Sequence, residues 1–176
     1  RLNFTFHFLN FLSNADLFFT TSFAVLNNFK SQKMKPVKLI SWFLGITMFI
    51  FGILKVMIPT ITGWFSVQMT NSGLGEYIPV WVGITGEIVV GLALIISLVL
   101  DKNLTPKNFK VIIQLASAMI IPMMATAIYV HLQPKVPVEV LPLKIRPPFI
   151  PIFIMLLAMA NIYLVQYKLK DRVNIF

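Results

Sequence analysis

The segment IPVWVGITGEIVVGLALIISLVL, Ile78–Leu100, decides the fold class of this chain, because Glu87 is the single charged residue in an otherwise apolar run. A hydrocarbon core of roughly 30 Å is crossed by about 20 residues of α-helix. Pro79 lies in the first turn, where a helix tolerates proline. The segment is therefore predicted to be a transmembrane helix over residues 78–100.

Three further runs have the same length and character. They cover residues 37–58, 110–131 and 148–167. Pro36 precedes the first of them and Pro59 follows it, and proline starts a helix or prevents its continuation at such places. The sequence thus predicts an all-α fold, an integral membrane four-helix bundle within residues 34–176.

The composition agrees with a membrane environment. Hydrophobic residues make up 57% of the chain and charged residues 12%, with a mean hydropathy of +0.83, whereas soluble domains are roughly one quarter charged. The net charge of +9 comes from basic residues between the apolar runs, so membrane topology explains it better than nucleic-acid binding. The chain has no cysteine, which excludes a disulfide or a thiolate metal site of its own.

The basic residues also predict an orientation. Lys and Arg gather before the first helix, between the second and third, and after the fourth, whereas residues 59–77 contain none. The connection at residues 132–147 contains Lys135, Lys144 and Arg146. By the positive-inside rule, both termini are expected to be cytoplasmic and these two connections to be outer loops.

Residues 1–33 do not fit this scheme. They are rich in Phe, are interrupted by Asn and Asp, and have no small-residue cleavage pattern, so they make a poor signal peptide. From Met34 onward a short basic flank leads directly into an apolar helix. We expect residues 1–33 to be an extension upstream of a true start at Met34, with an interfacial helix as the alternative.

Two charged residues fall inside the predicted helices, Lys55 in the first and Glu87 in the second. A charge near the bilayer centre costs at least about 2.5–3.5 kcal/mol, so it calls for a partner, water or a function. Each lies on a stripe of small residues that would let the two helices approach closely. These predicted packing residues are Gly45, Gly52, Gly83 and Gly91. We predict a Lys55–Glu87 ion pair, which His131 of the third helix could join.

Simpler interpretations of these residues stay open. The long stem of Lys55 could carry its amine to the outer headgroups. Glu87 could be a protonated, structural carboxyl group, and His131 an interfacial hydrogen-bonding residue. Substitution of each side chain would distinguish these structural interpretations from a functional role.

Other polar and sulfur-bearing residues are interpreted as structural. The methionines of the third helix are assigned to ordinary packing and not to a copper site; they are Met119, Met123 and Met124. Three polar residues are expected to form interhelical hydrogen bonds, namely Gln114, Ser117 and Asn161. With only His7 and His131 available, no metal set can be assembled, and none is expected.

Three segments in order carry a resemblance. They are FGILK (Phe51–Lys55), GITGEIVVGLAL (Gly83–Leu94) and HLQPKVPVEVLP (His131–Pro142), followed by a fourth helix that begins with prolines. Together they resemble the DoxX-like family of small bacterial four-helix membrane proteins, over about residues 35–168. The resemblance implies that Lys55, Glu87 and His131 occupy the polar positions of that family, and Gly52 and Gly83 its close-packing positions.

The resemblance also implies a location in the bacterial plasma (inner) membrane, with membrane lipid as a partner. That family takes its name from a subunit associated with quinone-linked oxidation of sulfur compounds, and some members resemble membrane anchors for oxidative-stress enzymes. We therefore expect an accessory or quinone-interacting subunit of such an assembly, not an enzyme on its own. Its polar site would consist of Lys55, Glu87 and His131.

A quinone is the one cofactor that the resemblance suggests. The expected partners are a redox enzyme or further copies of the chain, and nucleic acid is not expected. Two other classes of function stay open, a small transporter or binding protein for an amphipathic solute, and a purely structural membrane partner protein.

Overall fold

The computed structural model of this protein describes residues 35–173, with side chains as far as Tyr167. The predictions for residues 1–33 and for a start at Met34 lie outside the described residues. Within them the chain forms α-helices, short 3-10 helices and connections, and no strand.

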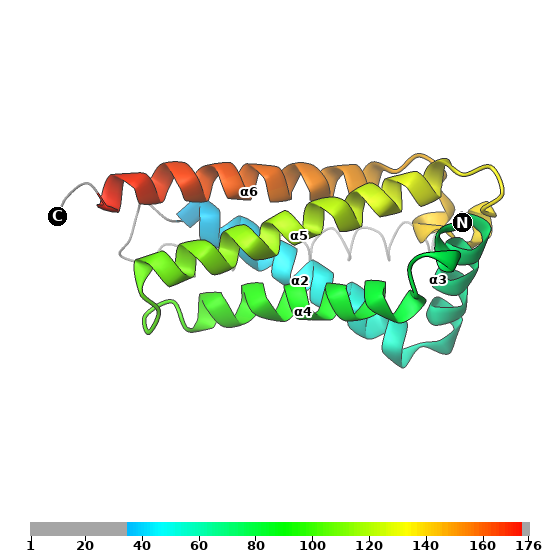
Figure 1. Ribbon diagram of the computed structural model, residues 1–176, viewed down its shortest axis with the longest axis horizontal. Helices are drawn as coiled ribbons and strands as arrows, with labels where there is room; N and C mark the ends of the chain where they lie inside the picture. Colours follow the sequence, from blue (N-terminus) through cyan, green and yellow to red (C-terminus); the bar gives the residue numbers. More distant parts are fainter. Residues whose placement is uncertain (1–34, 174–176) are drawn as a thin grey trace, which may run out of the picture. The chain divides into compact units, whose positions relative to one another are not determined.

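Four long helices account for most of the described chain (Figure 1). They are α2 (Lys35–Met57), α4 (Val80–Val99), α5 (Pro106–Leu132) and α6 (Phe149–Val173). Each contains a stretch long and apolar enough to cross a membrane, which confirms the four predicted segments. The largest difference at a helix start is in α5, where Pro106 occupies the first turn and the Thr105 hydroxyl accepts a hydrogen bond of 3.2 Å from the N–H of Asn108. This N-cap begins the helix before the apolar run.

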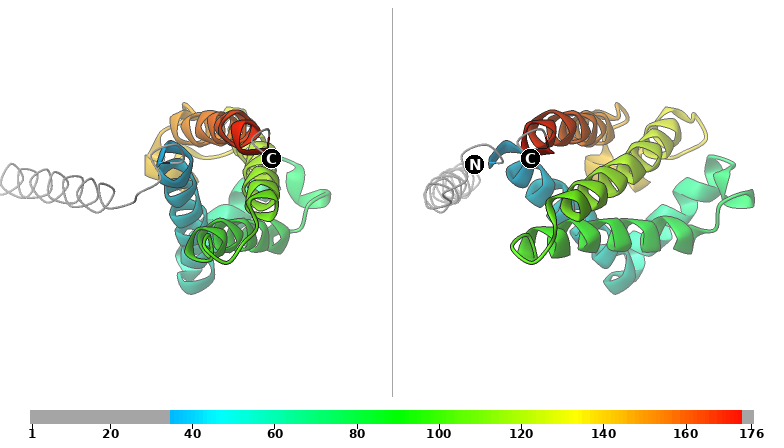
Figure 2. Two further views of the ribbon diagram at one scale, coloured as in Figure 1. Left: turned by 90° about the vertical axis from the view of Figure 1, so that its left-hand side faces the viewer. Right: turned by 60° about the vertical axis from the view of Figure 1, so that its left-hand side comes forward.

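The four helices run alternately in opposite directions and lie around a common core in the order α2, α4, α5, α6 (Figure 2). Helix α6, the last in this order, also contacts α2, the first. Phe43 of α2 and Phe153 of α6 pack edge to face, with their ring centroids 6.2 Å apart. Fully buried apolar side chains fill the core between them, and the largest are Leu44, Met48, Leu94, Ile113 and Ile120. The predicted all-α bundle is therefore the observed arrangement.

The connection at residues 59–77 is not an open loop. It contains a further helix, α3 (Pro59–Asn71), and a short 3-10 helix, η1 (Leu74–Glu76). Ile58 has an extended backbone, with φ −116° and ψ 101°, and Pro59 starts the new helix. The prediction treated Pro59 as a helix end only, although proline is equally suited to a first turn.

We call the end of the bundle that carries α3 the α3 end. The connection between α5 and α6 lies there too and contains two further 3-10 helices, η2 (Val138–Val140) and η3 (Pro142–Lys144). The Gln68 side chain of α3 donates a hydrogen bond to the C=O of Val140, and the Arg146 guanidinium donates one of 3.2 Å to the C=O of Val136. The two connections therefore form one hydrogen-bonded cap.

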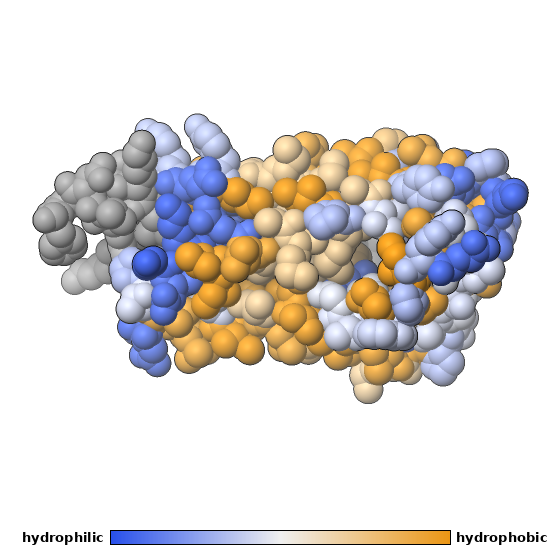
Figure 3. Space-filling model, viewed as in Figure 1, coloured by the Kyte–Doolittle hydropathy of each residue, from blue (hydrophilic) through white to orange (hydrophobic). Residues whose placement is uncertain are grey.

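The outer surface of the long helices is apolar. At most 33% of the residues in each membrane-length stretch are buried, and the exposed remainder includes large side chains such as Leu115, Val99 and Leu156. Hydrophobic residues cover the middle of the face seen in Figure 3, and hydrophilic residues gather toward the ends. The four helices thus have both the length and the lateral surface that a membrane crossing needs.

Candidate functional site

The two charged residues within the membrane-length helices meet between α2 and α4. Lys55 Nζ lies 2.5 Å from Glu87 Oε1, and their side chains are only 14% and 11% exposed. The predicted ion pair is confirmed. The alternative in which Lys55 extends to the headgroups is wrong, because the amine turns inward to the carboxylate.

Glycines at the α2–α4 contact explain how the two charges come so close. A Cβ on Gly91 would lie 2.5 Å from the backbone nitrogen of Phe49, and one on Gly45 would lie 3.0 Å from Leu94 Cβ. A Cβ on Gly52 would meet Ile88 at 2.5 Å and Glu87 Cβ at 3.2 Å. The predicted close packing at these three glycines is confirmed, and the absence of side chains lets the backbones approach.

Gly83, the fourth predicted packing residue, has a different neighbour. A Cβ there would lie 3.0 Å from the ring of Phe65, which belongs to α3 and not to α2. The same ring covers Lys55, whose Nζ lies 4.2 Å from the ring centroid. Thr62 donates a hydrogen bond to the C=O of Lys55. Helix α3 therefore covers the ion pair from the α3 end.

Sequence reasoning missed both α3 residues. Thr62 and Phe65 are three residues apart, which places them on one face of a helix. This spacing is a weak signal in the sequence, because it places the two side chains on one face only if residues 59–71 form a helix. A reading of Pro59 as a first-turn proline would have found them.

One oxygen of the buried carboxylate is unsatisfied. Glu87 Oε1 accepts from Lys55, but Oε2 is buried and has no hydrogen-bond partner. An unpaired buried acceptor costs roughly 1–3 kcal/mol, and more when it is charged. The site therefore offers an acceptor that a hydroxyl group or a proton would satisfy.

His131 does not join this pair. Its ring is buried, and Nδ1 lies 2.9 Å from the C=O of Ala127, one turn earlier in α5. Gly86, beside Glu87, is level with Met123, because a Cβ on Gly86 would lie 3.3 Å from Met123 Cε. His131 is more than two turns further along α5, about 12 Å at 1.5 Å per residue. The three-residue polar site that we expected is thus a two-residue site with a separate histidine.

A second polar cluster lies deep in the bundle. The Asn161 Nδ2 of α6 donates hydrogen bonds of 2.9 Å to Ser41 Oγ in α2 and 3.0 Å to Ser117 Oγ in α5. All three residues are fully buried. Interhelical hydrogen bonding is confirmed for Ser117 and Asn161, while Gln114 has no such bond among the described residues. Ser41 was missed because a lone serine in an apolar helix carries no distinguishing pattern.

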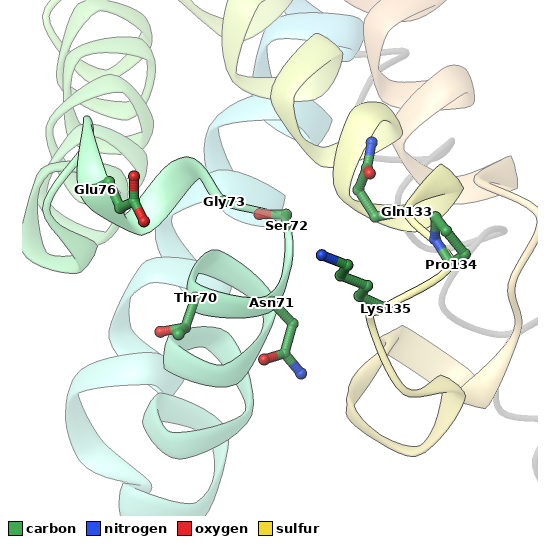
Figure 4. Close-up of a pocket in the computed structure, with 8 residues that line it drawn as sticks. All are labelled: Thr70, Asn71, Ser72, Gly73, Glu76, Gln133, Pro134 and Lys135. Atoms are coloured by element: carbon green, nitrogen blue, oxygen red, sulfur yellow. The ribbon is translucent and has the colours of Figure 1, made fainter.

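A polar hollow lies at the α3 end, between the last turn of α3 and the end of α5 (Figure 4). Its lining residues are Thr70, Asn71, Ser72, Gly73, Glu76, Gln133, Pro134 and Lys135. The Lys135 amine points across the hollow toward the turn that contains Ser72. The charged groups of the hollow, Glu76 and Lys135, are exposed, so the hollow lacks the desolvation that distinguishes the Lys55–Glu87 site.

The opposite end of the bundle carries a second ion pair. Lys38 Nζ in α2 lies 2.6 Å from Asp101 Oδ2, just beyond α4, and the two side chains are 24% and 30% exposed. Because both are partly hydrated, this pair resembles an ordinary surface ion pair.

No family model, curated protein or solved structure matches the chain. Over residues 35–173, the fold and the site define an all-helical protein with four helices long and apolar enough to cross a membrane and a largely desolvated ion pair between two of them.

Proposed function

We propose that the chain is a DoxX-like multi-pass protein of the bacterial plasma (inner) membrane, with both termini in the cytoplasm. The four apolar helices support insertion, and the distribution of Lys and Arg supports the orientation. Trp64 and Trp81, both at the α3 end, are 42% and 66% exposed, as expected for aromatic side chains at a membrane–water interface.

We further propose that it acts as a quinone-interacting accessory subunit of a redox or oxidative-stress assembly. The observation that carries this proposal is the buried Glu87 Oε2, which has no partner. A quinol is an apolar molecule with hydroxyl donors, so it can enter an apolar site. The Glu87 carboxylate would accept a hydrogen bond from one of these hydroxyl groups. The resemblance of the three sequence segments to the DoxX-like family supports the same role.

The chain's own residues would bind and orient such a ligand. Glu87 Oε2 would accept a hydrogen bond, and Lys55, which already donates to Oε1, has two further ammonium hydrogens for a carbonyl oxygen. A bound quinone would supply the electron-carrying group. The partner enzyme would supply or take up the electrons.

The Glu87→Gln variant tests this proposal. The amide keeps the side-chain shape but loses the charge and the capacity to hold a proton, so we expect quinone reduction in membranes to fall by about tenfold or more, in the range of general acid–base effects. Glu76→Gln, which changes an exposed carboxylate of the α3 end, is the matched control and should leave the rate unchanged. An unchanged rate in Glu87→Gln at normal expression would contradict the proposal. Mass spectrometry of ligands and proteins retained after gentle solubilisation would independently identify a quinone or a redox enzyme.

A purely structural lock between α2 and α4 is the second candidate. It is favoured by the close packing at Gly52, where an added Cβ would lie 3.2 Å from Glu87 Cβ and 3.0 Å from the backbone nitrogen of Ile88, so the ion pair lies beside a close contact of the two helices. The double variant Lys55→Glu/Glu87→Lys separates the two functions. A structural pair tolerates the reversal, whereas a ligand site loses its acceptor and donor in the required places.

A further inference from the structure

The Lys55–Glu87 pair is closed toward the core by apolar side chains. Met48 and Leu44 follow Gly52 at intervals of one helical turn along α2 toward the opposite end, and Leu94 faces them from α4; all three are fully buried. The contact between Gly91 and the backbone of Phe49 closes the α2–α4 seam at the same depth. No polar side chain of this layer offers a path, since the next buried polar cluster, around Ser41 and Asn161, lies beyond it.

Toward the α3 end, an aromatic ring of α3 covers the Lys55 amine. Phe65 stacks over the Lys55 amine at 4.2 Å from its centroid and also rests against Gly83 at contact distance. It is only partly buried, so one of its sides faces away from the pair. Phe65 thus lies between the Lys55 amine and Gly83, and part of its ring is exposed.

The helix that carries Phe65 is bounded by two non-helical junctions. Ile58 is extended at its start, and Gly73, just after its end, has a φ of 77°, which is a left-handed conformation that suits glycine. Between them, α3 is attached through Gln68 to Val140 and through Thr62 to Lys55. A small rotation of α3 about these junctions would lift Phe65 without unfolding α2 or α4.

We propose that Phe65 controls access to the Lys55–Glu87 pair, and that this pair is reached from the α3 end alone. Phe65 is a positioning residue: its ring holds the Lys55 ammonium against Glu87 Oε1 by a cation–π contact and occupies the space over the pair that the ring of a ligand would take. The inference takes one point from the proposed function, namely that a ligand reaches the Lys55–Glu87 pair.

Acylation of lysines by a membrane-impermeant sulfonated succinimidyl acetate, quantified for each peptide by mass spectrometry, tests the proposal on the full chain. Lys135, exposed at the α3 end, and Lys102, exposed at the opposite end, serve as internal references. In detergent we expect Phe65→Ala to raise the rate at Lys55 relative to Lys135 by about tenfold, which corresponds to the loss of a contact worth about 1.4 kcal/mol. Trp64→Ala, which removes the neighbouring exposed ring of α3, is the matched control and should leave this ratio unchanged.

Phe65→Leu keeps most of the volume but removes the ring, so it should raise the ratio less than Phe65→Ala and more than Trp64→Ala. This second variant carries the test if Phe65→Ala does not remain monodisperse. A ratio unchanged in both Phe65 variants, or raised equally by Trp64→Ala, would overturn the proposal.

The direction of access is tested in sealed vesicles of one orientation. Lys55 of the Phe65 variant should be acylated from the face that labels Lys135. Labelling from the face that labels Lys102 would refute access from the α3 end alone. Because neither readout uses a quinone or an enzyme partner, this inference and the proposed redox function can fail separately.

Discussion

At the scale of single residues, the dominant energetic feature is the burial of Lys55 against Glu87. Removing two charges from water is expensive, and their attraction offsets that cost only when the geometry is good and the remaining polar atoms are satisfied. Here the ion pair is short and the amine also faces the Phe65 ring, yet Glu87 Oε2 has no partner. A group that is incompletely satisfied at such a depth is where a ligand gains most by binding.

Removing one partner of this pair should therefore destabilise the protein strongly. In Lys55→Met the carboxylate is left buried and unpaired, and we expect the free energy of unfolding in detergent to fall by about 3 kcal/mol. The double variant Lys55→Met/Glu87→Leu removes both charges and should recover most of this loss.

Lys135→Met is the matched control for that measurement. Its amine is exposed, so the substitution should change the free energy of unfolding by less than about 0.5 kcal/mol. A loss in Lys55→Met as small as that of the control would show that the pair contributes little to stability.

At the scale of the helices, the position of each element depends on where backbones approach most closely. Gly45, Gly52 and Gly91 leave no room for a side chain of their own at the α2–α4 contact, while α5 and α6 are joined to α2 through the amide of Asn161. Helix α3 contacts the site through side chains, with Phe65 against Gly83 and the Thr62 hydroxyl donating to the C=O of Lys55. The position of α3 therefore depends on side-chain contacts that single substitutions can remove.

Gly91→Ala should disrupt the α2–α4 contact. The added methyl group would lie 2.5 Å from the backbone nitrogen of Phe49, and a backbone atom cannot rotate away as a side chain can. We expect a loss of about 1–3 kcal/mol in the free energy of unfolding, typical of overpacking.

Gly63→Ala in α3 is the matched control, because nothing lies within 4 Å of the Cβ it would add. There the helix propensity of alanine should leave stability unchanged or raise it by up to about 1 kcal/mol. Equal destabilisation by the two substitutions would contradict the assigned packing at Gly91.

At the scale of the whole chain, the described residues present an inverted distribution of polarity. The flanks of the long helices are apolar, whereas the charged pair and the Ser41–Asn161–Ser117 cluster lie inside. In water such a surface would aggregate, but in lipid it is the favourable one. Under the proposed membrane insertion, the basic side chains at the ends would set the orientation.

The proposed orientation can be tested with single cysteines, because the chain contains none of its own. Asn103→Cys, in the connection between α4 and α5, should be protected from an impermeant maleimide added to intact cells. Leu143→Cys, 75% exposed in the connection before α6, should be labelled. Permeabilised cells provide the control, in which both positions should react. Labelling of Asn103→Cys alone in intact cells would reverse the topology.

The four long helices and the Lys55–Glu87 pair could both be predicted from the amino-acid sequence. Helices in a membrane-length apolar run satisfy their own backbone groups, so their positions follow from local composition. Two opposite charges on glycine-lined helical faces of neighbouring segments have few other partners. The four apolar runs and the spacing of Gly52, Lys55, Glu87 and Gly91 were enough for both predictions.

Two features of the site could be known only from the tertiary structure: the cover of the ion pair by Phe65, and the distance of His131 from it. Phe65 became part of the site because α3 folds over the bundle end, and Ser41 met Asn161 across a separation of 120 positions in the sequence. His131 stays apart from Glu87 because it lies more than two turns beyond Met123, the α5 residue level with Gly86. Composition and helical period fix which residues share a face of one helix, but not how far one helix slides along another, since packing of all side chains sets that displacement.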